Sequence, residues 1–124
     1  MQPYNEAFPV LRDVLLEDSW VLAVWPSDTS LAFDLEAVLT PAHRDYVGPK
    51  PGEQHDYRRA HLVITSDGLR CDLSGAPPAT DATGQTDLGH IDNWLVEEAG
   101  RSLLEGGWGA ATADNPSVEL RFIE

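Results

Sequence analysis

The sequence predicts a mainly β domain, built as an antiparallel β-sandwich or a partly open barrel with at most one or two short helices. Residues 31–40 alternate between two sets of side chains, one of them apolar, which is typical of a strand with one buried face. Turn-forming residues recur at intervals of about ten residues, as they do in all-β folds. The sequence has no internal repeat and no alternation of strands with helices, which argues against the common nucleotide-binding folds.

The N-terminal quarter predicts one short helix followed by one buried strand. Between residues 8 and 15 apolar side chains are spaced three and four positions apart, and Pro9 favours a helix start. Residues 20–25 are apolar at every position, so we expect a strand covered on both faces or the end of a buried helix. Both of its tryptophans, Trp20 and Trp25, are then expected in the core.

The middle of the chain predicts a β-hairpin. Residues 61–65 and 69–73 form its two strands, and Asp67 and Gly68 between them supply the positive φ angles of a tight hairpin turn. Cys71 lies in the second strand, on the same face as two leucines. We therefore interpret it as a small core residue rather than as a catalytic thiol.

The last third predicts a long loop and then further strands. Residues 74–87 are small, polar and proline-bearing, which is typical of a loop. The segment that follows fits a helix ending at Gly100 or a strand over 90–96, and we favour the strand. Residues 101–105 and 118–123 form the last pair of strands. The side chains expected to face inward are Leu31, Phe33, Leu35, Leu62, Ile64, Leu120 and Phe122.

Length and charge limit the classes of function. A chain of 124 residues fits a single domain over residues 1–124, and its net charge of −13 repels nucleic acid and anionic lipid. We expect neither nucleic acid nor a membrane as a partner. The N-terminus lacks a secretory pattern and Cys71 is the one cysteine, so we expect a cytoplasmic protein.

Positive charge is concentrated in one short segment. Positions 43–61 hold four of the eight basic residues and three of the four histidines. With three acids the segment is formally +1, while the four basic and eighteen acidic residues elsewhere sum to −14. Its prolines, glycines and tyrosines predict a structured loop over 41–59 that presents side chains to a partner.

Binding residues are expected in and beside this loop. Tyrosines and arginines are the residue types that most often anchor protein interfaces. The alternative is a loop that covers one end of the sheet, with its arginines bound to Asp34 or Glu36. Of the tryptophans, Trp94 or Trp108 is expected to make an exposed contact. The predicted binding residues are Tyr46, Tyr57, Arg58, Arg59 and Trp108.

The same segment contains candidate metal ligands. Histidine and carboxylate side chains within 19 positions supply the ligand types that transition metals use, but no standard ligand spacing is present. The alternative is a polar loop in which the histidines bond to the backbone or to neighbouring carboxylates. The candidate ligands are His43, Asp45, His55 and His61.

No organised catalytic motif is present. Ser74 is not in a nucleophile elbow, and the adjacent Glu97 and Glu98 would point apart on a strand. Residues 106–109, Gly-Gly-Trp-Gly, lack phosphate-loop spacing and predict a sharp bend between strands with the tryptophan packed across it. We predict no catalytic residue and no cofactor.

Several short motifs carry a family resemblance. Residues 89–92 (Gly-His-Ile-Asp), 104–109 (Leu-Glu-Gly-Gly-Trp-Gly) and 118–120 (Val-Glu-Leu) resemble those of small bacterial immunity proteins of polymorphic-toxin systems, which close with a Gly-x-Trp-Gly strand. The stretch 36–58 is similar to one in uncharacterised bacterial β-rich proteins, with Glu36-Ala37, His43, Asp45-Tyr46, Pro49 to Glu53 and Tyr57-Arg58 as its matching residues. The resemblance implies an all-β cytosolic binding protein with no catalytic residues to carry over.

Two functional hypotheses follow. The first is a non-enzymatic binding protein, in its most concrete form an immunity-like inhibitor of a basic toxin protein, because a −13 domain accelerates its encounter with a cationic partner. The second is a small metal- or ligand-binding β-protein that uses the histidine-rich segment.

Overall fold

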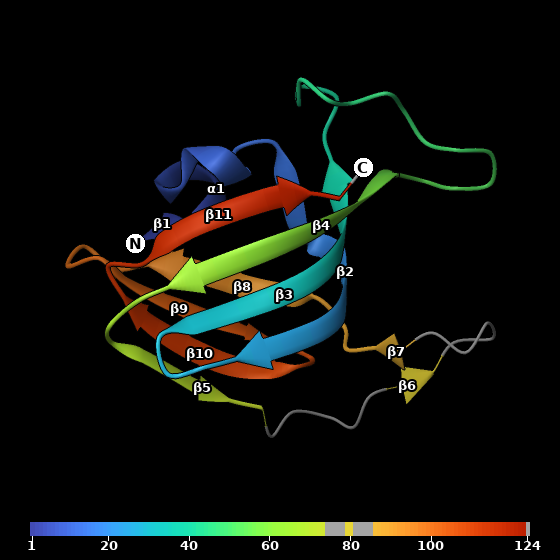
Figure 1. Cartoon of the computed structure of the whole chain (residues 1–124). Helices are drawn as coiled ribbons and strands as arrows, with labels where there is room; N and C mark the ends of the chain where they lie inside the picture. The colour runs from blue at the N-terminus through green and yellow to red at the C-terminus, as the bar shows by residue number, and fades with distance from the viewer. Residues whose placement is uncertain (74–78, 81–85, 124) are drawn as a thin grey trace.

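The chain forms two antiparallel sheets packed face to face, as the computed structural model of residues 1–73, 79–80 and 86–123 shows (Figure 1). Two short helical segments precede them, α1 (Tyr4–Ala7) and the 3₁₀ turn η1 (Pro9–Leu11). The strands are β1 (Gln2–Pro3), β2 (Val14–Pro26), β3 (Ser30–Leu39), β4 (Asp56–Thr65), β5 (Leu69–Asp72), β6 (Ala79–Thr80), β7 (Thr86–Asp87), β8 (Ile91–Val96), β9 (Arg101–Gly106), β10 (Gly109–Asp114) and β11 (Ser117–Phe122).

The two sheets have different strand orders. The front sheet in Figure 1 runs β11-β4-β3-β2, and the back sheet runs β1-β8-β9-β10-β5. A separate two-stranded sheet pairs β6 with β7. Every strand pair is antiparallel, and in the described residues neither sheet closes into a barrel. The predicted mainly β, sandwich-like fold is confirmed.

The core lies between the two sheets. Alternate residues of β3 and β4 point inward, and Leu31, Phe33, Leu35, Leu62 and Ile64 are fully buried, as predicted. Leu120 and Phe122 of β11 are half-buried and pack against the same core. From the back sheet, Ile91, Trp94, Leu104 and Trp108 complete it. Period-two alternation therefore identified the inward faces of the front sheet.

The N-terminal segment is less helical than predicted. The chain turns through α1 and η1, but Leu15 already lies in β2, so the predicted helix ends before it. Tyr4 fixes this segment to β2, because its hydroxyl accepts the Leu16 N–H at 2.9 Å and lies 2.7 Å from Glu17 Oε1. Burial and the neighbouring Glu17 carboxylate raise the pKa of Tyr4, so the hydroxyl stays protonated.

The tryptophan predictions are reversed in the structure. Trp20 and Trp25 were expected in the core, yet their side chains are 37% and 63% exposed. The apolar run 20–25 belongs to β2, which is an edge strand and is covered on one face only. Trp94 and Trp108, one of which was expected at the surface, are both buried. A continuous apolar run does not distinguish a central strand from an edge strand with an apolar outer face.

The predicted hairpin over 61–65 and 69–73 is wrong. Strand β4 belongs to the front sheet and β5 to the back sheet, where β5 pairs with β10. The turn between them, which includes Gly68, crosses from one sheet to the other, and Gly68 is not among the glycines with positive φ. Ser66 holds this crossing, because its hydroxyl donates to the carbonyl of Asp114 at 2.6 Å.

The remaining elements largely agree with the sequence. A strand, β8, occupies the segment where helix and strand competed, and β9 and β11 lie where the last two strands were predicted. Strand β10 was not predicted, because its sequence Gly-Ala-Ala-Thr-Ala-Asp has no large apolar residue. The loop expected at 74–87 lies mostly outside the described residues. Its described residues form the short strands β6 and β7.

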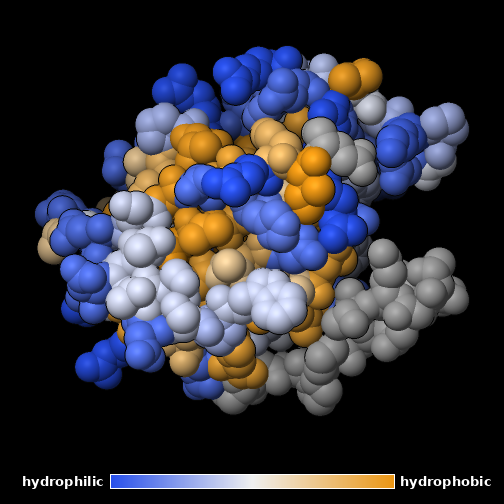
Figure 2. All heavy atoms as spheres, in the orientation of Figure 1, coloured by the Kyte–Doolittle hydropathy of each residue, from blue (hydrophilic) through white to orange (hydrophobic). Residues whose placement is uncertain are grey.

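The outer face of the front sheet mixes apolar and charged groups. Figure 2 shows apolar side chains gathered over its middle, with hydrophilic groups interleaved and along the upper rim. Outward positions in adjacent strands include the partly exposed Ala32 and Val63, which are paired across β3 and β4. Next to them, Asp34 is paired with His61. This face therefore has no single sign of charge.

Candidate functional site

The segment singled out by its charge, residues 43–61, is part loop and part strand. Residues 56–59 of the loop predicted over 41–59 belong to β4, and residues 40–55 form a loop that joins β3 to β4 (Figure 1). We call it the presenting loop. It begins with two tight turns, in which the His43 N–H donates to the Thr40 carbonyl at 2.9 Å and the Tyr46 N–H to the His43 carbonyl at 3.0 Å. Gly48 and Gly52 adopt φ angles of 117° and 84°, which glycine tolerates best. The loop thus has a defined backbone conformation.

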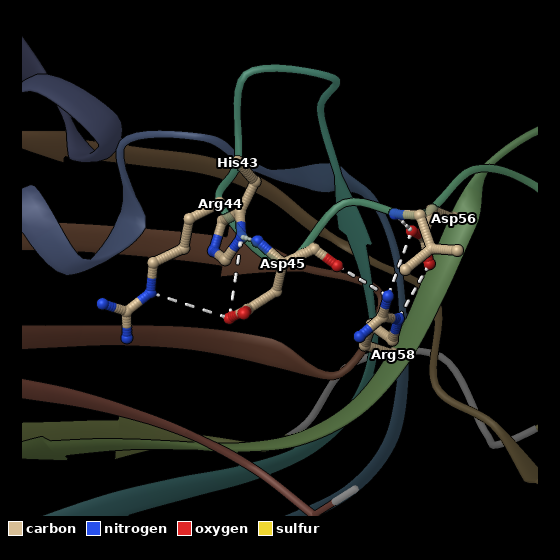
Figure 3. Close-up of polar contacts among 6 residues, drawn as sticks. His43, Arg44, Asp45, Asp56 and Arg58 are labelled. Carbon is tan, nitrogen blue, oxygen red and sulfur yellow. Dashed lines mark hydrogen bonds and ion pairs between the residues drawn. The ribbon is translucent and has the colours of Figure 1, made fainter.

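The first residue of β4, Asp56, organises the loop (Figure 3). Its buried carboxylate accepts the N–H groups of Val47 at 2.8 Å and Gly48 at 3.1 Å, and Arg58 Nε at 2.9 Å. Arg58 also donates to the carbonyl of Asp45 at 2.7 Å. One ion pair at the start of β4 therefore holds residues 45–48 of the loop.

The Asp56 carboxylate is ionised in this setting. Burial alone would raise its pKa, but the N–H donors of Val47 and Gly48 and the neighbouring Arg58 outweigh burial, and the pKa lies below its usual value. Arg58, predicted as a binding residue, is committed to this ion pair and to the loop backbone. Its role in the described structure is to shape the loop.

Arg59 is also engaged within the chain. Its guanidinium lies 3.0 Å from Asp34 on the neighbouring strand β3. This contact is the alternative in which the arginines pair with Asp34 or Glu36, and the structure confirms it for Arg59. Two of the four basic residues of the segment, Arg58 and Arg59, are therefore paired with acids of β4 and β3.

The two predicted tyrosines are both half-buried but have different neighbours. Tyr46 packs against the hydrophobic core and anchors the loop. Tyr57 is half-buried on β4, and its ring meets His55 edge-on with centroids 5.8 Å apart. Of the pair, Tyr57 is the one that borders open space.

A groove of about 370 Å³ lies between the presenting loop and β4, bordered by Tyr57. Its lining residues are Glu36, Val47, Gly48, Lys50, Glu53, Asp56, Tyr57, Arg58 and Arg59. Asp56 and Arg58 pair with each other, whereas Glu36 and Glu53 form no ion pair with any described residue. The groove therefore presents two unpaired carboxylates, with Lys50 as its one unpaired cation.

Glu36 and Glu53 were not among the residues predicted to bind. The alternation of β3 placed Glu36 outward, but the sequence does not show that Glu36 faces Arg59 across the β3–β4 register. Glu53 lies in the loop, and only its folded position brings it to the groove. The structure alone identifies this pair.

The histidines do not gather around a metal site. His43 accepts the Asp45 N–H at its Nδ1 and packs edge-on against Phe122, while His55 contacts Tyr57 and His61 lies on the outer face of β4. Within residues 1–73, 79–80 and 86–123, no three His, Cys, Asp or Glu side chains form a group that could hold a metal ion. Of the candidate ligands, His43 and Asp45 lie 4.0 Å apart, but His55 and His61 do not join them in a group.

We expect zinc or nickel at modest excess to change Tm by less than about 1 °C, because a ligand without a preformed site does not stabilise the folded state. Thermal unfolding followed by circular dichroism measures this shift. A rise of several degrees that His43→Ala and His55→Ala abolish would contradict this expectation and would favour a metal-binding protein.

Trp108 cannot make the predicted surface contact. Its side chain is 3% exposed and meets Phe33 edge-on, with ring centroids 5.0 Å apart. Residues 106–109 form the turn between β9 and β10, so the predicted bend with the tryptophan packed across it is correct. Glycines are needed here, because a side chain at Gly106 would collide with the backbone carbonyl of His90.

Cys71 is free and half-buried. Burial and the adjacent Asp72 charge raise the pKa of its thiol, which keeps it protonated. Such a thiol is a poor nucleophile, so Cys71 fits a structural role better than a catalytic one.

No helix in the described part of the chain is long and apolar enough to cross a membrane. Comparison of the chain with protein families, with curated proteins and with solved structures finds no match in any of the three.

Proposed function

We propose that this chain is a non-enzymatic binding protein that takes a basic protein as its partner, and that a lysine or arginine of the partner enters the groove between the presenting loop and β4. The observation that carries the proposal is the pairing of charges in the groove. Arg58 and Arg59 are held by Asp56 and Asp34, which leaves Glu36 and Glu53 available to an incoming cation.

The whole molecule supports the same partner. A net charge of −13 raises the rate of encounter with a cationic protein, and the groove then offers a specific position for one cation. Tyr57 at the groove edge supplies an aromatic face against which a basic side chain can pack. The structured loop reduces the entropy that binding would otherwise lose. We place this protein in the cytoplasm, in keeping with its free cysteine.

The most specific form of the proposal is an immunity-like inhibitor of a basic toxin. In that form the toxin is the partner, and co-expression of this chain must restore growth to cells that produce the toxin. Growth that is restored by the wild type but not by the Glu36→Gln, Glu53→Gln double variant supports the inhibitor. Equal rescue by the wild type and the double variant would show that the groove carboxylates are not needed to inhibit the toxin.

The groove is tested with a lysine-rich peptide as the probe, titrated calorimetrically at low salt. We expect Glu36→Gln and Glu53→Gln each to weaken binding about threefold to tenfold, since each removes one ion pair of about 1 kcal/mol. Glu98→Gln is the matched control, because it makes the same change of charge on an exposed turn outside the groove. The proposed contact is wrong if all three variants lose the same small amount of affinity.

A further inference from the structure

Strand β11 leaves one edge of the front sheet open. It pairs with β4 on one side, and no described strand lies on the other (Figure 1). The N–H of Ile123 donates to the carbonyl of Arg59 at 3.0 Å, and hydrogen-bonded pairs alternate along an antiparallel ladder. The N–H and C=O groups of Val118, Leu120 and Phe122 therefore point to the open side. No described residue bonds to them.

The opposite edge of the front sheet is protected. Val21 of β2 exchanges hydrogen bonds with Leu88 and Gly89, at 3.0 Å and 2.8 Å, and the strand ends in Pro26, which has no N–H to offer. Proline and covering segments are common means of preventing edge-to-edge association. Strand β11 has no proline within its six residues, and although η1 approaches it, no described residue bonds to its outward N–H and C=O groups.

A groove of about 430 Å³ lies beside the open edge. Leu120 and Phe122 of β11 form part of its lining, together with Pro9 and Val10 of η1 and residues 42–45 of the presenting loop. Val10 is 42% exposed there. A strand added to β11 would direct its inward side chains over this groove, where apolar surface is available to cover them.

The sequence of β11 is complementary to itself in an antiparallel pair. With Leu120 opposite Leu120 of a second copy, Glu119 faces Arg121 of the partner subunit and Val118 faces Phe122 of the partner subunit. Oppositely charged side chains directly across a ladder stabilise it. Within one chain Glu119 and Arg121 already pair at 2.8 Å on the outer face, so both charges lie on the side that this pairing requires.

We propose that two copies of this chain associate through β11, in an antiparallel pair centred on Leu120 that joins the two front sheets. The open N–H and C=O groups of the three outward residues supply about six hydrogen bonds across the symmetric pair. The apolar residues on the inward face extend the core across the interface, and two Glu119–Arg121 pairs fix the register. The partner at β11 is thus a second copy of this chain. This interaction is independent of the basic protein that is proposed to bind at the groove beside the presenting loop.

Salt is expected to affect the two associations in opposite ways. Two copies at −13 each repel one another over long range, so screening strengthens the dimer. Screening weakens the attraction between this chain and a basic partner. A failure of one proposal therefore does not imply a failure of the other.

The experiment is sedimentation equilibrium at about 0.5 mM protein in low salt and in about 0.5 M NaCl, where the Debye length is only a few Å. We expect a dimer that strengthens with salt. Arg121→Glu alone and Glu119→Arg alone place like charges opposite each other, so each should weaken self-association about tenfold or more. An equimolar mixture of the two variants restores opposite charges and should form a heterodimer, and the double variant should dimerise like the wild type.

Arg101→Glu is the matched control, because Arg101 forms a similar exposed ion pair with Asp114 on the back sheet and should leave the dimer unchanged. Unfolding curves of all variants verify that each is folded. A wild type that remains monomeric at high salt overturns the proposal. So does a dimer that neither single charge reversal on β11, Arg121→Glu or Glu119→Arg, weakens.

Discussion

Replacing Asp56 by alanine is expected to lower the free energy of unfolding by about 3 kcal/mol, because removing one partner of a buried ion pair leaves the other without compensation. The N–H groups of Val47 and Gly48 would lose their acceptor at the same time, which adds to the cost. Urea unfolding followed by tryptophan fluorescence measures the change. The presenting loop should also become accessible to proteases, since Asp56 and Arg58 hold it.

The matched control is Asp34→Ala. Asp34 also pairs with an arginine, Arg59, but the two side chains are 20% and 41% exposed, whereas that of Asp56 is 5% exposed. A more exposed pair contributes about 1 kcal/mol or less. Equal losses in the two variants would show that burial of Asp56 does not set its contribution, and this account of the loop would be wrong.

The same carboxylate makes stability depend on pH. The pKa of Asp56 is lower in the folded chain than the value of about 3.9 typical of an unfolded chain, so the folded state binds the proton less tightly. The contribution of Asp56 is complete above the unfolded pKa and is lost as the pH falls through the folded pKa. Unfolding free energies of the wild type should therefore fall more steeply below about pH 4 than those of Asp56→Asn. Parallel curves would contradict this assignment.

Strands β3, β4 and β11 of the front sheet could largely be predicted from the sequence, because apolar residues alternate along most of their length. Leu31, Phe33 and Leu35 were assigned to the core on that basis and are fully buried. The pairing of strands could not be predicted in the same way. The Asp67-Gly68 turn has hairpin chemistry, yet it carries the chain from one sheet to the other, because β5 is taken up by β10.

The tryptophans show a second limit. Apolar content predicts burial on average, but large aromatic side chains also occur at surfaces. Trp20 packs against His90 with the rings tilted and their centroids 4.3 Å apart, and it stays partly exposed at the sheet edge. Trp94 lies in a polar stretch of sequence, yet its Nε1 donates to the buried Ser102 hydroxyl at 3.0 Å, which satisfies its polar atom in the core.

The charge pattern of the sequence located the candidate site, but the contacts in the structure show which of its residues are available for binding. Composition located the loop between β3 and β4, but it left open whether Arg58 and Arg59 are available to a partner or bound to Asp34 or Glu36. Arg58 pairs with Asp56 on its own strand, whereas the partner of Arg59 depends on the β3–β4 register, in which Asp34 is paired with His61, two positions from Arg59. The sequence contains no local signal for a contact between residues 25 positions apart.

Replacing Gly106 by alanine is expected to cost at least about 3 kcal/mol, the upper range for overpacking in a well-packed region. The added Cβ would coincide with the carbonyl oxygen of His90 and lie 2.6 Å from Nε1 of Trp108. The first atom belongs to the backbone, which cannot move by changing rotamer, so the start of β8 must shift away from β9. Trp108 would shift with it, and near-ultraviolet circular dichroism should report the change in its packing against Phe33.

Gly52→Ala is the control for this effect, because Gly52 has a φ of 84° but nothing within 4 Å of an added Cβ. There only backbone strain applies, about 1 kcal/mol, and the near-ultraviolet spectrum should stay unchanged. If Gly106→Ala destabilises the chain no more than Gly52→Ala does, the close approach of His90 to β9 is not rigid. The Gly-Gly-Trp-Gly turn would then be required for its bend alone, and contact with the segment before β8 would not explain its glycines.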